Sequence, residues 1–306
     1  MKKALKIISL VATLLLIAFF VFRKEDIPVE KLLPNYTTPA SRFVEIDDMN
    51  VHYRIEGEGK PVVLLHGVGA CLQTWDEWTD SLKKYYKVIR LDLPAYGLTG
   101  PRPDNDYSFS TCNAFLNKFF TTLKIDSFAL AGNSLGGEIA WKYTLENPQR
   151  VTRLILVDPG GYKLKNKNSF NVLSLLKYKW LTNIVDQLDT KHFIVPAMKK
   201  SFYSDSCITK ERVQLYYDMM MRAGNRKSLA TAMPQYMAAP QLDASRINTP
   251  TLIQWGKYDE EIDVSLAENF RKIPRSVYIE YDHCGHTVQQ EAMPESVTDV
   301  IKFLKQ

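Results

Sequence analysis

The chain has 306 residues, of which 45% are hydrophobic and 24% are charged, which is enough for one large domain, with or without an insertion. Its formal net charge is +5, but residues 1–26 carry five cations and two anions, so +3 belongs to this segment and only +2 to the rest. This balance gives no electrostatic reason to expect nucleic acid as a partner. The four cysteines are scattered without metal-type spacing, so no disulfide framework, metal site or cofactor is expected.

The N-terminal segment combines positive charge with an apolar run. Three lysines precede residues 7–22, which are apolar apart from Ser9 and Thr13, and charged residues follow. A helix over this run would span about 24 Å, short of a hydrocarbon core of about 30 Å, so length alone fits either a signal peptide or a short membrane helix. The run ends without the small residues that cleavage requires, which favours a signal anchor over residues 1–26. The expected partner of this segment is a membrane, with the following domain outside the cytoplasm, on the periplasmic face in a bacterium; secretion after cleavage is the alternative.

Residues 27–41 contain three prolines and are expected to form an extended tether. Phe43 to Ile46 and Val51 to Ile55 alternate apolar and polar residues around a short polar turn, which predicts an antiparallel hairpin. Pro61 to Leu65 is a continuous apolar run, typical of a strand buried on both faces of a parallel sheet.

Strand and helix patterns then alternate up to about residue 160 and again from about residue 248. This alternation predicts an α/β fold with a mostly parallel, doubly wound sheet. Between these parts, residues 161–247 lack strand signals and contain helical patches rich in large apolar residues, among them Phe170 to Leu188 and Val213 to Met221. We therefore expect a core formed by residues 42–160 and 248–306, with residues 161–247 inserted as a helical cap.

One short motif carries the strongest chemical signal. Gly132, Ser134 and Gly136 form G-x-S-x-G between an apolar strand and a helical pattern, which is typical of a nucleophile elbow. A serine at such a sharp turn brings the residues two before and two after it into close contact, so only glycine fits there. The turn also leaves the backbone N–H of Leu135 at a helix N-terminus, where it can stabilise an oxyanion.

Three further motifs extend this signal into a resemblance to the α/β-hydrolase family. The loop from His66 to Gly69 resembles its H-G-x-G oxyanion loop, and residues 255–259 resemble its acid loop. Gly285 and His286, followed by Glu291 and Pro294, resemble its histidine loop. The order Ser, Asp, His is that of this family. The resemblance implies a serine esterase-like or lipase-like member with a helical cap.

By the same resemblance, Ser134 is the nucleophile, His286 the general base and Asp259 the acid that orients the imidazole. The oxyanion would be bound by the backbone N–H groups of Val68 and Leu135.

Alternatives remain for several of these residues. His283 competes with His286, and both Asp158, which ends an earlier strand, and Asp263 compete with Asp259. His66 is expected to fix the oxyanion loop by hydrogen bonds, and Asp92 to be a structural hydrogen-bonding residue. His52 and His192 are expected to be ordinary surface or cap residues.

The serine at position 134 argues against haloalkane dehalogenases and epoxide hydrolases, which attack with an aspartate. The expected substrate is a small-molecule carboxylic ester with a hydrophobic acyl group. A carbon-carbon hydrolase of the meta-cleavage type is the alternative, although Thr287 stands where those relatives usually carry tryptophan; a non-catalytic ligand receptor is a further one. Large apolar side chains of the cap are expected to pack it onto the core and partly to line an acyl pocket: Phe170, Leu173, Leu175, Leu176, Trp180, Phe193, Phe202, Tyr216, Tyr217, Met219, Met220 and Met221.

Overall fold

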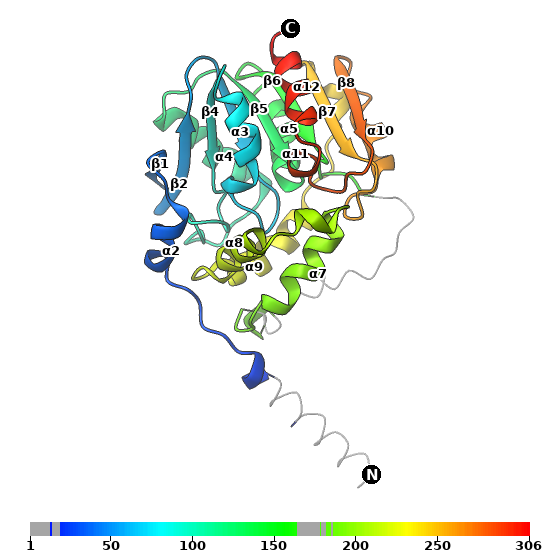
Figure 1. Cartoon of the computed structure of the whole chain (residues 1–306). Coiled ribbons are helices and arrows are strands. Elements are labelled where there is room, and N and C mark those ends of the chain that lie inside the picture. Colours follow the sequence, from blue (N-terminus) through cyan, green and yellow to red (C-terminus); the bar gives the residue numbers. More distant parts are fainter. Residues whose placement is uncertain (1–12, 14–18, 164–177, 179–181, 185) are drawn as a thin grey trace.

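An eight-stranded sheet forms the centre of the molecule in the computed structural model, which describes residues 13, 19–163, 178, 182–184 and 186–306 (Figure 1). The strand order is β1-β2-β4-β3-β5-β6-β7-β8. The strands are β1 Ser41–Ile46, β2 Met49–Glu56, β3 Pro61–Leu65, β4 Lys87–Leu91, β5 Phe128–Asn133, β6 Val151–Val157, β7 Thr251–Gly256 and β8 Ser276–Tyr281. β1 and β2 form the predicted hairpin, β2 pairs antiparallel with β4, and all later pairings are parallel.

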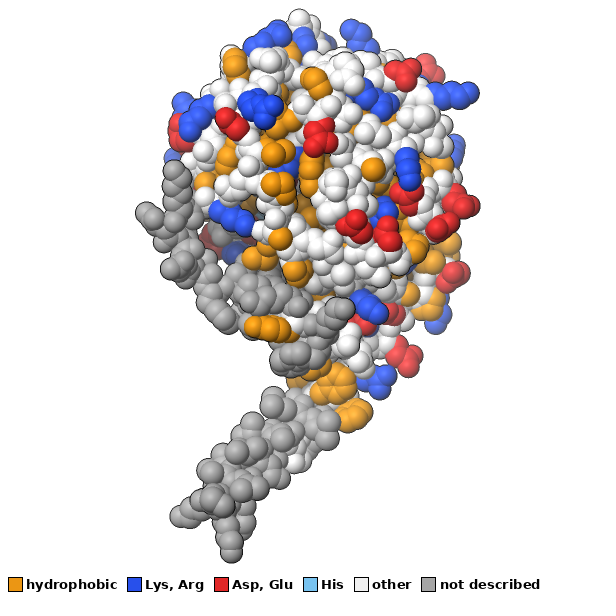
Figure 2. All heavy atoms as spheres, turned by 180° about the vertical axis from the view of Figure 1, so that it is seen from behind, with side chains coloured by type: hydrophobic (Ala, Val, Ile, Leu, Met, Phe, Trp, Pro, Cys, Tyr) orange, Lys and Arg blue, Asp and Glu red, His pale blue; other side chains and the backbone are white. Residues whose placement is uncertain are grey.

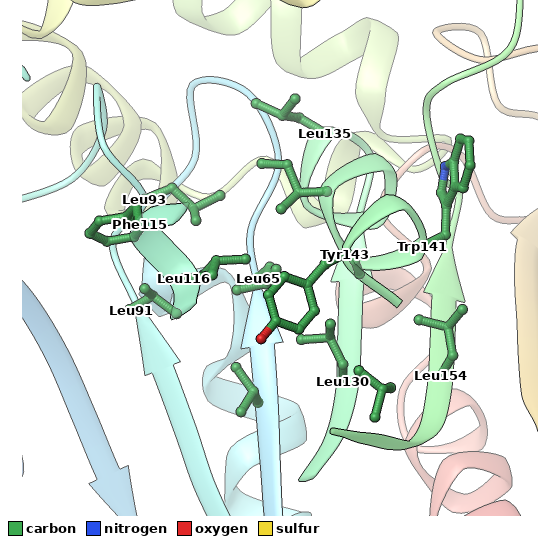
Figure 3. Packing of buried hydrophobic residues seen from close by; sticks show 14 of the residues in the cluster. Leu65, Leu91, Leu93, Phe115, Leu116, Leu130, Leu135, Trp141, Tyr143 and Leu154 are labelled. Carbon is green, nitrogen blue, oxygen red and sulfur yellow. The ribbon is translucent and has the colours of Figure 1, made fainter. Parts of the chain in front are cut away.

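Apolar side chains alternate between the two faces of the central strands. Val63 and Leu65 of β3 belong to one core cluster, whereas Val62 and Leu64 belong to the other, because successive side chains of a strand point to opposite faces. Both faces are covered, so the strand is apolar throughout. Figure 3 shows one of these clusters, in which Leu65 packs near side chains from neighbouring strands and helices.

Helices cover the two faces of the sheet. Helices α4 (Phe109–Thr122), α5 (Leu135–Glu146) and α10 (Ala267–Phe270) contribute to one cluster, and α3 (Asp76–Leu82), α11 (Val288–Glu291) and α12 (Glu295–Leu304) to the other. The predicted α/β fold with a mostly parallel, doubly wound sheet is confirmed.

A helical cap lies between β6 and β7. It contains α7 (Lys191–Ser201), α8 (Lys210–Met221) and α9 (Asn225–Ala238), and it lies at the end of the sheet opposite the C-terminus of the chain (Figure 1). The helical patch expected from Val213 to Met221 is part of α8. Most of the patch expected from Phe170 to Leu188 lies outside the described residues.

The segment before β1 differs from the extended tether expected over residues 27–41. Val29–Tyr36 form helix α2, whose Leu32 is buried against Leu98 and Met219. The expectation of an extended chain is wrong here, because tertiary packing supports a helix that Pro34 alone would disfavour. Within the part of the chain that the structure describes, no helix has both the length and the apolar composition needed to cross a membrane.

Candidate active site

Ser134 lies at the turn between β5 and α5. Its backbone φ is +56°, a left-handed value that is uncommon outside glycine. The two flanking glycines permit this turn: a Cβ on Gly132 would lie 2.2 Å from the carbonyl oxygen of Gly136, and one on Gly136 would lie 2.2 Å from that of Leu65. The contacts expected from the G-x-S-x-G spacing are therefore present.

The loop after β3 lies directly beside the serine. A Cβ on Gly67 would lie 3.0 Å from the Cβ of Ser134, so a larger residue would crowd the serine. The backbone N–H groups of Val68 and Leu135 donate no hydrogen bond to another residue that the structure describes. These two donors can therefore bind an oxyanion beside Ser134.

His66 holds this loop in place, as expected. Its Nδ1 lies 2.8 Å from the carbonyl oxygen of Gly67, and its Nε2 accepts a hydrogen bond from the backbone N–H of Leu93 at 3.0 Å. These partners fix a neutral tautomer with the proton on Nδ1. Burial lowers the pKa of His66, which also favours the neutral ring.

Asp259 and His286 come together although 27 residues separate them in the sequence. The Nδ1 of His286 lies 2.7 Å from the Oδ2 of Asp259, while Oδ1 of Asp259 accepts hydrogen bonds from the backbone N–H groups of Glu261 and Ile262. The other ring nitrogen, Nε2, is buried and has no hydrogen-bond partner among the described residues. His286 lines the same pocket as Ser134, so a buried imidazole whose Nε2 has no partner among the described residues shares this pocket with the hydroxyl.

The electrostatic environment of His286 favours its protonated form. Burial acts to lower the pKa, but the carboxylate of Asp259, with smaller contributions from Glu261 and Asp158, outweighs it and raises the pKa of His286 to about 9. The imidazolium formed when the ring accepts a proton is thus stabilised in place.

The competing residues occupy other positions. Asp158 is buried, and its carboxylate accepts hydrogen bonds from the backbone N–H groups of Gly256 at 2.8 Å and Val288 at 3.4 Å. Burial and the charge of Asp259 raise the pKa of Asp158 well above its ordinary value. Asp263 caps the next helical turn, and His283 is exposed. The carboxylate hydrogen-bonded to the ring of His286 is that of Asp259.

The sequence did not reveal several groups that position the histidine loop. The carbonyl oxygen of His286 accepts a hydrogen bond from Asn133 at 3.0 Å, and its backbone N–H donates to the carbonyl of Ser201 at 2.7 Å. The Glu291 carboxylate accepts from the backbone N–H of Gly285 at 2.7 Å and from that of Tyr203 at 2.8 Å. Two signals were available in the sequence: Asn133 directly precedes the serine, and Glu291 belongs to the histidine-loop motif.

Another expectation is corrected near the oxyanion loop. His52 is a fully buried residue of β2 rather than a surface or cap residue, and its Nδ1 lies 2.8 Å from the Oδ2 of Asp92. Asp92 also accepts hydrogen bonds from the backbone N–H groups of Leu72 and Leu98, so its structural role is confirmed. His52 was misplaced because this partner lies 40 residues away in the sequence.

Two pockets meet at Ser134 and Val68, with volumes of about 230 and 210 Å³. The larger also contains His286, and the cap residues that line it are mostly apolar: Ile194, Ala197, Met198, Ser201, Phe202, Tyr216, Met220 and Leu229. The smaller is lined in part by Glu138, Lys163 and Gln241.

Only some of the cap residues expected to line an acyl pocket do so. Phe202, Tyr216 and Met220 line the larger pocket, whereas Phe193 is exposed and Met219 packs against α2. The remaining described residues, Tyr217 and Met221, line neither pocket. Phe170, Leu173, Leu175, Leu176 and Trp180 lie outside the described residues.

Comparisons with known proteins agree with this architecture. A model of the alpha/beta hydrolase fold matches residues 60–292. The chain is 26% identical to a 2-hydroxy-6-oxo-2,4-heptadienoate hydrolase of Pseudomonas putida, covering 85% of this chain and 94% of that protein. It is also 26% identical to the human monoacylglycerol lipase ABHD6, covering 86% and 81%. The crystal structure of a putative lipase from Acinetobacter baumannii superposes with a TM-score of 0.76 at 25% identity, covering 92% of this chain and 97% of that one.

Proposed function

Because this chain belongs to the α/β-hydrolase family, we propose that it is a serine hydrolase of neutral carboxylic esters with hydrophobic acyl groups, a carboxylesterase or lipase. Its relatives include hydrolases of more than one chemistry. One observation carries the proposal. Ser134, Val68 and His286 line one largely apolar pocket, and His286 is hydrogen-bonded to Asp259 behind it. The backbone N–H groups of Val68 and Leu135 flank the serine and donate to no other residue that the structure describes.

The reaction proceeds through an acyl-enzyme. The Oγ of Ser134 attacks the ester carbonyl carbon while Nε2 of His286 takes the hydroxyl proton, and the N–H groups of Val68 and Leu135 bind the oxyanion that forms. The carbon–oxygen bond then breaks, and His286 returns its proton to the departing alcohol. A water molecule, deprotonated by His286, releases the acid by the reverse sequence. Asp259 orients the imidazole and stabilises its charged form throughout.

The charges around the site favour a neutral ester over a dienol acid. Glu261 lines the larger pocket and Glu138 the smaller one, where Lys142 pairs with it at 2.6 Å. Lys163, also in the smaller pocket, donates a hydrogen bond to the carbonyl of Met237. A substrate carboxylate in the larger pocket would face Glu261, so the meta-cleavage reaction is not favoured.

A panel of p-nitrophenyl esters with acyl chains of two to sixteen carbons tests this proposal on the full chain in detergent. We expect turnover that improves from acetate towards longer chains, since each buried methylene contributes about 0.8 kcal/mol, and then declines when the pocket is full. Hydrolysis of a dienol acid with no turnover of any ester would overturn the proposal.

We further propose that residues 7–22 anchor the protein to a membrane with the catalytic domain outside the cytoplasm. The support is the sequence itself: an apolar run that begins after three lysines and ends without small residues. The protein should stay with the membrane fraction after an alkaline wash. A mature N-terminus between Ala18 and Ile27 in intact-mass analysis would instead mean a secreted enzyme.

A further inference from the structure

The chain that follows the apolar run is joined to the cap by backbone hydrogen bonds. The N–H of Lys24 donates to the carbonyl of Gln187 at 2.8 Å, and the N–H of Ile27 donates to that of Met221 at 2.7 Å. Each bond connects the N-terminal segment to a part of the cap more than 160 residues away in the sequence. The point at which the apolar run meets the body is therefore fixed on the cap.

An ion pair made by a buried arginine strengthens the same connection. Arg226 of α9 pairs with Asp26 at 2.6 Å and has a side chain only 2% exposed. Its guanidinium also donates to the backbone carbonyls of Lys24 and Leu188. One buried arginine thus binds the N-terminal segment and the cap together.

Large apolar side chains are exposed at this junction. Phe20, Val21 and Phe22 are 61%, 70% and 46% exposed, and Phe193 of α7 is 63% exposed. Phe22 and His192, which precedes Phe193, have ring centroids 5.9 Å apart. We call Phe20, Val21, Phe22 and Phe193 the cap-end surface; Figure 2 shows hydrophobic side chains gathered where the N-terminal segment leaves the body. Clustered exposed aromatic side chains indicate an interaction site.

Helix α7 separates this surface from the active site. Phe193 is exposed, whereas Ile194 and Met198 of the same helix are buried and line the pocket that contains Ser134. Because α7 exposes Phe193 and buries Ile194 and Met198 against the pocket, this helix lies between the pocket and the partner that contacts the cap-end surface.

We propose that the cap-end surface rests in a phospholipid bilayer and that the enzyme takes its ester from that bilayer. This inference rests on the proposed function. The occupant is indicated by continuity, because Phe20 to Phe22 are the last residues of the apolar run of residues 7–22 and the surface extends this run onto α7. The contact is apolar, so it should form in zwitterionic phosphatidylcholine vesicles and persist at high salt.

A fluorophore at position 193 tests the orientation directly. The full chain carrying Cys207→Ser, which removes the one cysteine that is not buried, receives Phe193→Cys and is labelled with an environment-sensitive dye. Tyr85→Cys is the matched control, since Tyr85 is an aromatic residue 53% exposed before β4, at the other end of the sheet. After reconstitution into phosphatidylcholine vesicles, lipid-borne doxyl groups should quench the dye at position 193 at least threefold more than the dye at position 85. Equal quenching would overturn the proposal.

Enzyme activity supplies the second arm. Phe193→Ser should lower hydrolysis of a long-chain ester embedded in the vesicles about fivefold or more while leaving turnover of a water-soluble short-chain ester unchanged, and Tyr85→Ser should change neither. Equal rates of Phe193→Ser and wild type on the embedded ester would contradict transfer from the bilayer. Failure of the wild type on every ester would instead refute the proposed function, and the quenching result would still report the orientation.

Discussion

Asp259 and Asp158 both lie near His286, and substitution separates their roles. Asp259 is hydrogen-bonded to Nδ1 of the ring, whereas Asp158 accepts from two backbone N–H groups. We predict that Asp259→Asn lowers kcat steeply, by about 10⁴-fold as in serine proteases. The amide oxygen would stay with the N–H groups of Glu261 and Ile262, so the NH2 group would face Nδ1 and hold the ring in the wrong tautomer. Asp158→Asn retains an acceptor oxygen and should have a mild effect on kcat.

The comparison uses purified variants with matching circular dichroism, so that unfolding is not mistaken for lost catalysis. An inactive Asp158→Asn beside an active Asp259→Asn would place the acid after β6 instead of β7.

The pKa of His286 sets the pH dependence. The ring accepts the serine proton only when neutral, and the pKa of about 9 means that it is largely protonated at pH 7. We therefore predict that kcat/KM for a soluble ester rises with pH through one ionisation near pH 9. Glu261→Gln removes one of the charges that raise this pKa and should move the midpoint to lower pH. A profile that is flat from pH 6 to 10, with chemistry rate-limiting, would exclude His286 as the base.

At the scale of elements, helix α2 is a part of the fold rather than a linker. Leu32 is 3% exposed in a cluster with Leu98 and Met219. Leu32→Ala should therefore lower the free energy of unfolding by about 2–5 kcal/mol, as truncation of a buried leucine generally does. Lys31→Ala, on the exposed side of the same helix, should leave the free energy of unfolding nearly unchanged. Denaturant titration of the two variants compares them, and equal stabilities would show that α2 does not pack as described.

The elements that sequence could predict are those whose signal is local. The elbow around Ser134 is readable because close contacts within five residues require glycine at fixed positions. The strand β3 is readable because burial on both faces requires a continuous apolar run.

The elements that sequence missed depend on distant partners. Helix α2 contains a proline and is stabilised by packing against residues far along the chain. The hydrogen bond from Asn133 to the carbonyl of His286 spans 153 residues, and no local pattern encodes it. The hydrogen bond from the backbone N–H of His286 to the carbonyl of Ser201 in the cap likewise joins residues far apart in the sequence.

At the scale of the whole molecule, the sheet and the cap supply different parts of the candidate site. The ends of β3, β5 and β7 carry the residues proposed as oxyanion loop, nucleophile and acid, while α7 and α8 line the apolar pocket that contains Ser134 and His286. Lys24 and Ile27 are hydrogen-bonded to the cap, whose helices α7 and α8 also line the pocket that contains Ser134. The cap lies at the end of the sheet opposite the C-terminus of the chain (Figure 1).

Covalent labelling of the full chain with a fluorophosphonate, followed by peptide mass spectrometry, tests the central claim most directly. We predict a single adduct on Ser134 that forms in step with the loss of ester turnover, since only an activated serine beside an oxyanion site reacts with this reagent. Ser134→Ala should fold normally, take up no label and hydrolyse no ester. Ester turnover that persists in folded Ser134→Ala, or an adduct on another residue that abolishes turnover, would contradict the account.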